Sequence, residues 1–437
     1  MVLFFVEMWE RFSYYGMRAL LFLYMTNPPE AGGLGFSLSK GGLIYGLYTF
    51  TVYALGLPGG FVADRWLGYR RAVVIGGVIL ACGHFALALP GIEFFYGGLV
   101  LIALGTGLLK TNCTSIVGLL YDKNDTGRRD SGYTIYYIGI NIGGMLAPLA
   151  TGALAQGETF RSWLQSNGID PDAAWHFAFG LAGVSMLLGL AQYLLQQRAL
   201  GDVGKVAGAV ERRRSSSPSG PLTRDEWQRI GVIVVLFLFA TVFWATFEQA
   251  ATTLSLFADR LTSNEFLGFE FPSTWFQSLN SFFVIGLGVV MSVVWVKLGD
   301  RAPSSPVKFA LGLILVGAGM ALLIPPSAFA ADGGGKVSPL WLCGTYFIHT
   351  VAELCLSPIG QSMTSRIAPA RVQGFMMGVW FMSLAFGNLI AGNVGGLFES
   401  FPLTTIFGTI FVICAAAAVA MLLLKPLLNR WTGDQRR

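Results

Sequence analysis

Twelve long apolar stretches run through this chain of 437 residues. A membrane-spanning helix requires about 20 apolar residues in succession, and each stretch comes close to that length or exceeds it. Charged residues make up 12% of the chain, whereas a soluble protein carries about 25%. The pattern predicts an all-α integral membrane protein with twelve transmembrane helices. They are expected at 3–26, 41–62, 72–90, 94–121, 132–156, 174–196, 229–257, 274–296, 307–326, 339–364, 373–397 and 403–424.

A polar region at 197–228 separates the first six stretches from the last six. It holds a basic run at 211–214 and a Ser/Pro/Gly-rich run at 215–221, a composition that cannot bury a core. We therefore expect two six-helix bundles, 1–196 and 229–437, joined by a solvated cytoplasmic linker. Two bundles of six helices are typical of transporters that rock two halves around a midplane site.

Lysine and arginine residues are distributed unevenly between the two sides of the membrane. Of the 29, 22 fall in the even-numbered loops and the carboxyl-terminal tail, four in the odd-numbered loops and three within helices. By the positive-inside rule, both termini face the cytoplasm, and we expect the chain in the inner (cytoplasmic) membrane. The net charge of +5 then reflects topology and contact with lipid head groups, and we expect no nucleic-acid partner.

Seven charged residues fall more than two residues from either end of a predicted helix, where burying a charge is expensive. They are Glu7, Glu10, Arg11, Arg18, Lys110, Glu248 and Glu353. At 100° per residue, the four on the first helix share one face with Tyr14, so this stripe is expected to line a cavity. A simpler alternative is that Glu7 lies near the membrane surface and pairs with Arg11 at i+4, but that leaves Glu10 and Arg18 unexplained. These early charges also make a cleaved signal peptide unexpected.

Six motifs resemble those of the proton-coupled oligopeptide transporter family, a branch of the major facilitator superfamily. In chain order they are Glu7-x-x-Glu10-Arg11-Phe12-x-Tyr14-Tyr15-Gly16, Gly59-Gly60-Phe61-Val62-Ala63-Asp64-Arg65-Trp66-Leu67-Gly68, Gly105-Thr106-Gly107-Leu108-Leu109-Lys110-Thr111-Asn112, Tyr136-Tyr137-Ile138-Gly139-Ile140-Asn141-Ile142-Gly143-Gly144, Phe243-Trp244-x-x-Phe247-Glu248-Gln249 and Glu353-Leu354-x-x-Ser357-Pro358. The resemblance implies a major facilitator fold and a proton-coupled symporter that imports di- and tripeptides by alternating access. The chain departs from the family at Thr111 and Ser281, where proline is common, and its linker is too short for two extra spanning helices.

Proton coupling is expected to involve the buried charges. The four intramembrane carboxylates outnumber the three cations by one, and one bound proton would neutralise that excess. A carboxylate that gains or loses a basic partner changes its proton affinity, which is a means of coupling. The resemblance implies a proton-coupling cluster of Glu7, Glu10, Arg11, Lys110 and Glu248, and a gate salt bridge between Arg18 and Glu248. We expect the proton as the coupling ion, with no other cofactor and no metal.

The expected substrate is a zwitterion, because the basic residues lie in the first half and Glu248 and Glu353 in the second. The resemblance implies that Glu353, with two asparagines, holds a peptide's ammonium group, while the basic residues and two tyrosines receive its carboxylate. The remaining aromatic candidates would form side-chain pockets, although most aromatic residues in such a chain pack in cores or interface belts. The candidate substrate-binding residues are Arg18, Tyr14, Tyr15, Tyr53, Lys110, Asn141, Trp244, Asn280, Glu353, Ser357 and Trp380, with Trp275 as a further pocket candidate.

Several alternatives remain open from the sequence. His349 lies one turn from Glu353 and would, in a purely structural reading, simply satisfy its carboxylate. The function itself could be that of a proton-coupled carrier of nitrate or a drug-like molecule, or of a peptide sensor that does not transport. An enzyme is not expected, because we find no phosphate-binding loop, metal-ligand cluster or activated nucleophile. The expected partners are peptides, protons and membrane lipids, and the chain is expected to be a monomer.

Overall fold

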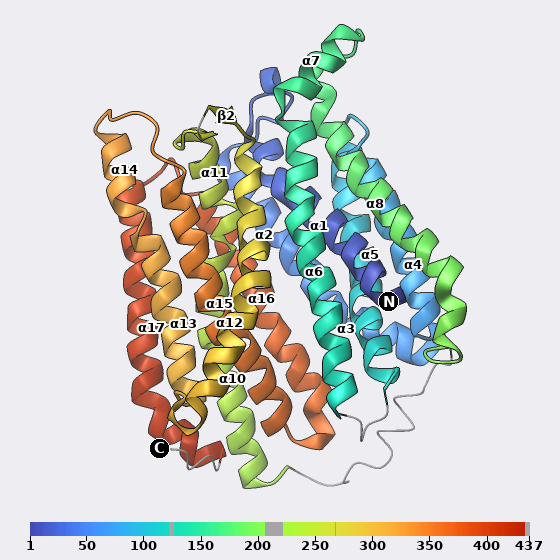
Figure 1. Cartoon of the computed structure of the whole chain (residues 1–437), viewed down its shortest axis with the longest axis vertical. Helices are drawn as coiled ribbons and strands as arrows, with labels where there is room; N and C mark the ends of the chain where they lie inside the picture. Colours follow the sequence, from blue (N-terminus) through green and yellow to red (C-terminus); the bar gives the residue numbers. More distant parts are fainter. Residues whose placement is uncertain (122–125, 206–221, 267, 433–437) are drawn as a thin grey trace. The chain divides into compact units, whose positions relative to one another are not determined.

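The chain forms two compact units in the computed structural model (Figure 1), which describes residues 1–121, 126–205, 222–266 and 268–432. Unit 1 comprises Met1–Ser37, Leu47–Ser215 and Leu267–Phe282, and unit 2 comprises Leu38–Gly46, Ser216–Phe266 and Phe283–Arg437. Each unit therefore holds most of one half of the sequence and one short segment of the other half. The basic and Ser/Pro/Gly-rich runs of the expected linker lie outside the described residues.

Unit 1 is built around α1, which packs against α5, α6 and α8 and can be followed in dark blue beside α6 in Figure 1. This central position explains why a helix with four charged residues is also almost entirely buried. The elements of unit 1 are α1 (Val2–Thr26), η1 (Pro29–Ala31), the second part of α2 (Leu38–Ala54), α3 (Gly56–Val62), η2 (Ala63–Leu67), α4 (Tyr69–Leu87), α5 (Ile92–Leu119), α6 (Thr126–Ala155), α7 (Glu158–Ser166), η3 (Pro171–Ala173), α8 (Ala174–Gln196), η4 (Gln197–Leu200), β2 (Phe269–Glu270), η6 (Ser273–Gln277) and the start of α12 (Ser278–Leu298).

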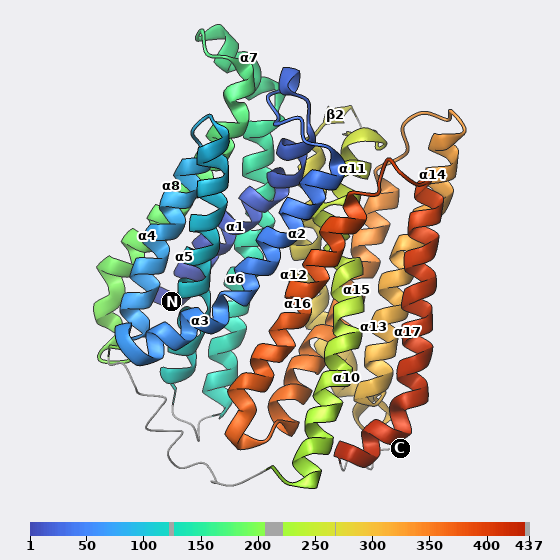
Figure 2. The ribbon, with the colours of Figure 1, turned by 180° about the vertical axis from the view of Figure 1, so that it is seen from behind.

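Unit 2 has an apolar core to which α10, α13, α15, α16 and α17 contribute, and these helices run beside one another in Figure 2. Fully buried members include Leu236, Phe243 and Phe309. The elements of unit 2 are the start of α2, α10 (Arg224–Phe247), η5 (Glu248–Ala251), α11 (Thr253–Arg260), β1 (Glu265–Phe266), the rest of α12, η7 (Gly299–Arg301), α13 (Ser305–Ala321), α14 (Ile324–Ala331), α15 (Leu340–Ile367), η8 (Ala370–Val372), α16 (Gln373–Gly395) and α17 (Leu403–Thr432).

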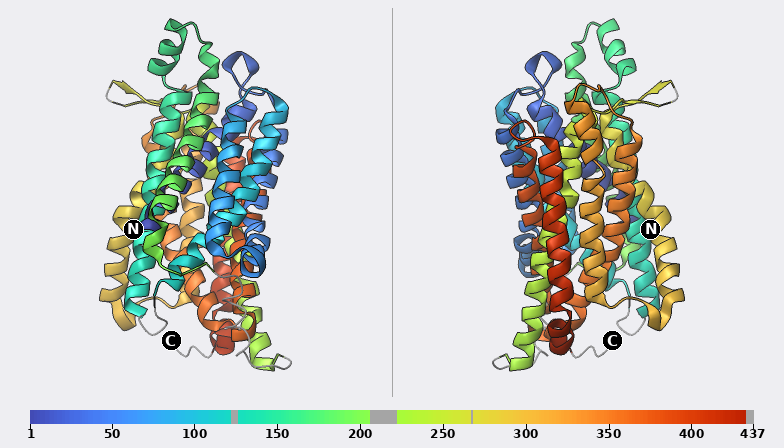
Figure 3. Two further views of the ribbon diagram at one scale, coloured as in Figure 1. Left: turned by 90° about the vertical axis from the view of Figure 1, so that its right-hand side faces the viewer. Right: turned by 90° about the vertical axis from the view of Figure 1, so that its left-hand side faces the viewer.

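The predicted all-α membrane fold is confirmed. Within the described ranges, eleven helices are long and apolar enough to cross a membrane. The twelfth predicted span is α1, which has 25 residues but carries too many charged residues to meet the same apolar criterion. The stretch predicted at 41–62 is interrupted, since α2 ends at Ala54 and α3 begins at Gly56. The sequence did not predict α7, a short helix that extends beyond the neighbouring ends of unit 1 in Figure 3.

Glycine allows the first part of α2 to cross α16 closely within unit 2. A Cβ atom added at Gly42 would overlap the carbonyl oxygen of Gly392, and one added at Gly392 would overlap that of Gly42. Gly46 meets the backbone of Leu389 in the same way. Small residues spaced four apart permit this kind of approach between membrane helices. This crossing explains why Leu38–Gly46 belongs to unit 2, whereas the rest of α2 belongs to unit 1.

The first turn of α4, which follows the turn at Gly68, holds described residues at the start of the linker. Gly68 turns the chain there with a positive φ of 75°, a conformation that favours glycine. The buried guanidinium of Arg70 then donates from Nε to the carbonyl oxygen of Val203 and from Nη2 to that of Gly201, at 2.7 Å in each case. The linker therefore begins as an ordered part of unit 1.

Candidate functional site

The charged stripe of α1 folds into a compact ion cluster. The Arg11 guanidinium donates from Nε to Glu10 Oε2 at 2.5 Å and from Nη2 to Glu10 Oε1 at 2.7 Å. The same Nε lies 3.3 Å from Glu7 Oε1. All three side chains are at most 2% exposed. Two buried carboxylates thus share one guanidinium, and Glu10 takes the bidentate geometry that makes such pairs strong.

A phenol from α6 completes this cluster. The Tyr136 hydroxyl donates to Glu7 Oε2 and lies 3.3 Å from the Thr114 hydroxyl of α5. The helices can approach because Gly139 and Gly143 face the backbone of α1 near Phe4 and Met8. Tyr136 lies three residues before Gly139 on the same face of α6, so its ring is directed toward α1.

Aromatic rings of unit 1 accompany its cations. The Arg11 guanidinium carbon lies 5.1 Å from the ring centroid of Tyr14, and that of Arg18 lies 5.9 Å from the centroid of Tyr15. On α5, the Lys110 ammonium lies 4.6 Å from the centroid of the Tyr53 ring. A cation within about 6 Å of an aromatic centroid is attracted to its face. The structure therefore brings the basic and tyrosine candidates of unit 1 together in pairs.

Three further candidates of unit 1 come from α6, η6 and the start of α12. Asn141 is 6% exposed, and its Nδ2 donates to the carbonyl oxygen of Tyr137 on its own helix at 3.0 Å. Asn280 lies in the first turn of α12. Trp275 donates from Nε1 to the carbonyl oxygen of Leu149 at 3.0 Å, so its indole fastens η6 to α6. A role of Trp275 in a side-chain pocket stays a prediction.

Unit 2 carries the two remaining carboxylate candidates. Glu248 begins η5 directly after α10 and is 4% exposed. Glu353 and Ser357 lie four residues apart on α15 and are half-buried. His349, considered as a partner for Glu353, instead places its Nε2 at 3.1 Å from the carbonyl oxygen of Val316. The pairing of Arg18 in unit 1 with Glu248 in unit 2 stays a prediction.

The two tryptophan candidates of unit 2 belong to its apolar core. The Trp244 ring lies edge-on to those of Phe243 and Phe247, with centroids 5.2 and 5.4 Å apart. Trp380 is 4% exposed and fills the space beside Gly360, where a Cβ atom would collide with its ring. These contacts are sufficient to explain both side chains as packing residues, so their predicted contact with substrate rests on the family resemblance alone.

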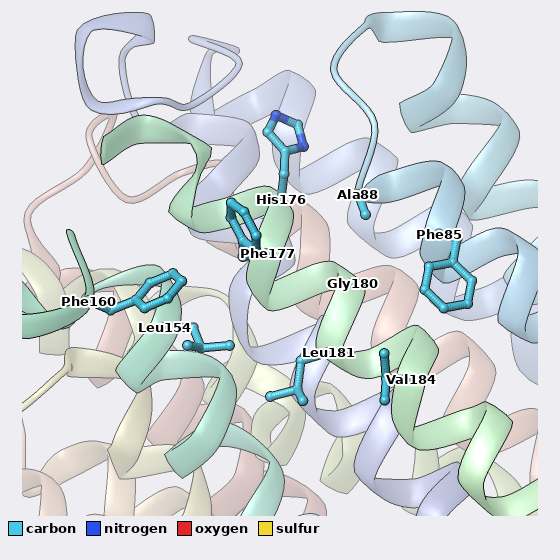
Figure 4. A pocket seen from close by; sticks show the side chains of 9 residues that line it. All are labelled: Phe85, Ala88, Leu154, Phe160, His176, Phe177, Gly180, Leu181 and Val184. Atoms are coloured by element: carbon cyan, nitrogen blue, oxygen red, sulfur yellow. The ribbon is translucent and has the colours of Figure 1, made fainter. Parts of the chain in front are cut away.

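An open apolar groove of about 500 Å³ lies on a different part of unit 1, among the ends of α4 and α6, α7 and α8. Figure 4 shows the side chains of Phe85, Phe160 and Phe177 around it, with His176 at one end. None of the candidate residues named from the sequence lines it. Among the described residues, no Asp, Glu, Lys or Arg side chain lines the groove, so we do not assign it to a charged substrate.

Sequence reasoning missed Tyr136 as a site residue, although it quoted the motif that contains it. The available signal was the spacing of Tyr136, Gly139 and Gly143, which puts a tyrosine on the glycine face of the helix.

In the described parts of the chain, no group of three or more His, Cys, Asp and Glu residues is arranged to hold a metal ion.

Comparison with known proteins identifies the family of this chain. The model of the POT family matches residues 70–215 and 220–413. A di-/tripeptide transporter of Lactococcus lactis subsp. cremoris is 32% identical, over 100% of this chain and 96% of its own length. The peptide transporter YePEPT of Yersinia enterocolitica subsp. palearctica is 34% identical, over 99% of this chain and 95% of its own.

Solved structures give the same result. A peptide transporter POT in complex with sulfate superimposes with a TM-score of 0.88 at 35% identity, covering 99% of this chain and 95% of the other. A POT family transporter in complex with 5-aminolevulinic acid superimposes with a TM-score of 0.87 at 29% identity, covering 98% and 96% of the two chains. The resemblance that the six motifs carry is confirmed, and this chain belongs to the POT family.

Proposed function

We propose that this chain is a proton-coupled symporter that imports di- and tripeptides across the cytoplasmic membrane by alternating access. Relatives that match nearly its whole length are named as peptide or di-/tripeptide transporters. The observation that carries the proposal for this chain is the buried cluster of Glu7, Glu10 and Arg11, because a carrier that binds protons needs carboxylates shielded from water and held by a cation.

The geometry of the cluster favours Glu7 as the carboxylate that takes the proton. Arg11 already makes two short hydrogen bonds to Glu10 and a longer contact of 3.3 Å to Glu7. One guanidinium cannot fully neutralise two carboxylates, and an uncompensated buried charge is costly. A proton on Glu7 would leave a balanced Glu10–Arg11 pair. The charge of Lys110 acts on Glu7 from α5, so the attraction between these two side chains would be lost when Glu7 takes the proton.

The proposed substrate contacts follow the charges that each unit carries. The basic side chains Arg18 and Lys110, with their tyrosine neighbours in unit 1, would receive the carboxylate of a peptide. Glu353 of unit 2 would hold its ammonium group, because a charged hydrogen bond to a carboxylate is about twice as strong as a neutral one. Asn141 and Asn280 would contribute neutral hydrogen bonds, and Glu248 would act in the gate with Arg18.

The decisive experiment is uptake of a labelled dipeptide by proteoliposomes that contain the purified chain. We expect uphill uptake when the outside is acidic, with loss of accumulation when a protonophore removes the gradient. Unlabelled di- and tripeptides should compete, whereas nitrate should not. Uptake that ignores the proton gradient would overturn the symport mechanism, and competition by nitrate rather than peptides would point to an anion carrier.

The Glu353→Gln variant tests how the ammonium group is recognised. Losing a charged hydrogen bond should weaken uptake of peptides with a free amino terminus by about tenfold, while amino-blocked peptides should lose much less. Glu399→Gln is a matched control, since Glu399 is an exposed carboxylate of the same unit that pairs with Arg260 at 2.5 Å. Equal losses for free and blocked peptides would remove Glu353 from the ammonium site.

A further inference from the structure

Tyr136 lies where three helices of unit 1 meet at Glu7. Its ring comes from α6, the glutamate from α1, and the neighbouring Thr114 hydroxyl from α5. Tyr136 is 6% exposed and Glu7 1% exposed, so water does not readily replace a hydrogen bond lost between them. Whatever the protonation state of Glu7, its carboxyl group needs a partner here, because a buried polar group without one is destabilising.

The groups around Glu7 differ in whether they can donate a hydrogen bond to its carboxyl group, accept one from it, or do both. From α1 come Arg11, which can only donate, and Glu10, which is already engaged by Arg11. From α5 come the Lys110 charge and the thiol of Cys113, a weak hydrogen-bonding group. The Tyr136 phenol from α6 is different, because a hydroxyl both donates and accepts. It can therefore serve a carboxylate and a carboxylic acid alike.

Thr114 gives the phenol a second direction in which to point its proton. The Thr114 hydroxyl donates to the carbonyl oxygen of Lys110 at 3.1 Å, which leaves its oxygen able to accept. When Glu7 is ionised, the phenol donates to Glu7. When Glu7 is protonated, the acid donates to the phenol oxygen, and the phenol proton turns to Thr114 at 3.3 Å. The phenol keeps its own proton throughout, and the proton that Glu7 binds is the one that moves.

We propose that Tyr136 is a positioning residue that keeps Glu7 hydrogen-bonded in both of its protonation states, with the Thr114 hydroxyl accepting a hydrogen bond from the phenol whenever Glu7 is protonated. This inference rests on the proposed proton coupling and adds residues to it. It predicts that loss of the phenol hydroxyl and loss of the Thr114 hydroxyl have opposite effects on how readily Glu7 binds a proton. Removing the phenol hydroxyl withdraws a donor mainly from the ionised form of Glu7, whereas removing the Thr114 hydroxyl withdraws an acceptor that only the protonated form uses.

The test measures gradient-driven dipeptide uptake against external pH for Tyr136→Phe and Thr114→Val. For Tyr136→Phe, we expect the pH of half-maximal uptake to rise by about one unit, the size expected for one charged hydrogen bond. For Thr114→Val, we expect it to fall, by less. Peptide exchange at equal pH on both sides requires no net proton movement, so in both variants we expect it to change less than gradient-driven uptake.

Tyr193→Phe is the matched control. Tyr193 is a fully buried tyrosine of α8, and its hydroxyl has no hydrogen-bond partner within the described part of the chain. Removing it should leave the pH profile unchanged. Thr114→Val keeps the test decisive should Tyr136→Phe not fold. Unshifted profiles, or shifts of the same sign in both variants, would overturn the inference while wild-type uptake remained proton-driven. Wild-type uptake without proton dependence would instead overturn the proposed function.

Discussion

The α1–α6 contact of unit 1 and the α2–α16 crossing of unit 2 both depend on glycine, yet they hold different chemistry. In unit 1, Gly139 and Gly143 bring α6 close to α1, and the result is a phenol within reach of a buried carboxylate. In unit 2, Gly42 and Gly392 bring two backbones into contact. Close approach therefore serves a charged network in one unit and steric fit in the other, and variants in the two places should fail for different reasons.

The largest effect is expected from removing the cation of the unit 1 cluster. Arg11→Ala would leave Glu7 and Glu10 buried without their shared guanidinium, and such a loss destabilises by about 3–5 kcal/mol. We expect a lower unfolding temperature in detergent and no gradient-driven uptake. Because protonation of the carboxylates would relieve part of this cost, the loss of stability should be smaller at acidic pH.

Arg11→Lys provides the control for Arg11→Ala. It keeps the positive charge but loses the planar fork that bonds both oxygens of Glu10, so its loss of stability should be intermediate. If Arg11→Ala unfolded at the wild-type temperature at neutral pH, the cluster would not be the energetically coupled unit that its distances indicate.

The next effect is steric and belongs to unit 2. In Gly392→Ala, the added methyl group would meet the carbonyl oxygen of Gly42, and forced overpacking costs about 1–3 kcal/mol. Gly286→Ala on α12 is a matched control, because a Cβ atom there meets no atom within 4 Å and alanine favours a helix over glycine. In thermal unfolding, we expect Gly392→Ala to lower the unfolding temperature and Gly286→Ala to raise it slightly. A loss from Gly392→Ala that varied with pH would break the distinction between steric and charged contacts.

The helices and the charged stripe could be predicted from the sequence because both follow from local periodicity. Apolar length located the membrane helices, and the 100° advance per residue put Glu7, Glu10 and Arg11 on one face of α1. Ion pairing within that face needs no knowledge of distant segments. The bidentate bond between Arg11 and Glu10 is therefore the kind of contact that a sequence can indicate.

The contacts between helices could not be predicted in the same way. Tyr136 reaches Glu7 only because of how α6 lies on α1, and the crossing at Gly42 joins residues about 350 positions apart in the chain. Trp244 shows a second limit of sequence analysis. The chemistry of an aromatic residue in a family motif does not decide whether its side chain lines a pocket or packs in a core. Pairing of distant residues, rather than local structure, is what the sequence left undetermined.

The smallest effect is expected from an ion pair of unit 2 that water can reach. Arg371 Nη2 donates to Glu226 Oε1 at 3.0 Å and Oε2 at 2.8 Å, and the two side chains are 19% and 21% exposed. Glu226 also caps α10 by accepting from the backbone N–H of Thr223 at 2.8 Å. Because glutamine can fill the same place in a capping box, Glu226→Gln removes the charge and leaves the cap.

A double-mutant cycle of Glu226→Gln and Arg371→Gln therefore isolates the ion pair from the cap. We expect a small coupling energy, measured from thermal unfolding, because ion pairs that water can reach contribute little, and a further decrease in high salt because solvent-accessible charges are screened. Salt should have little effect on the Arg11 cluster, which solvent does not reach. A coupling energy at Arg371 as large as the loss from Arg11→Ala would mean that burial is not what makes the unit 1 charges costly to separate.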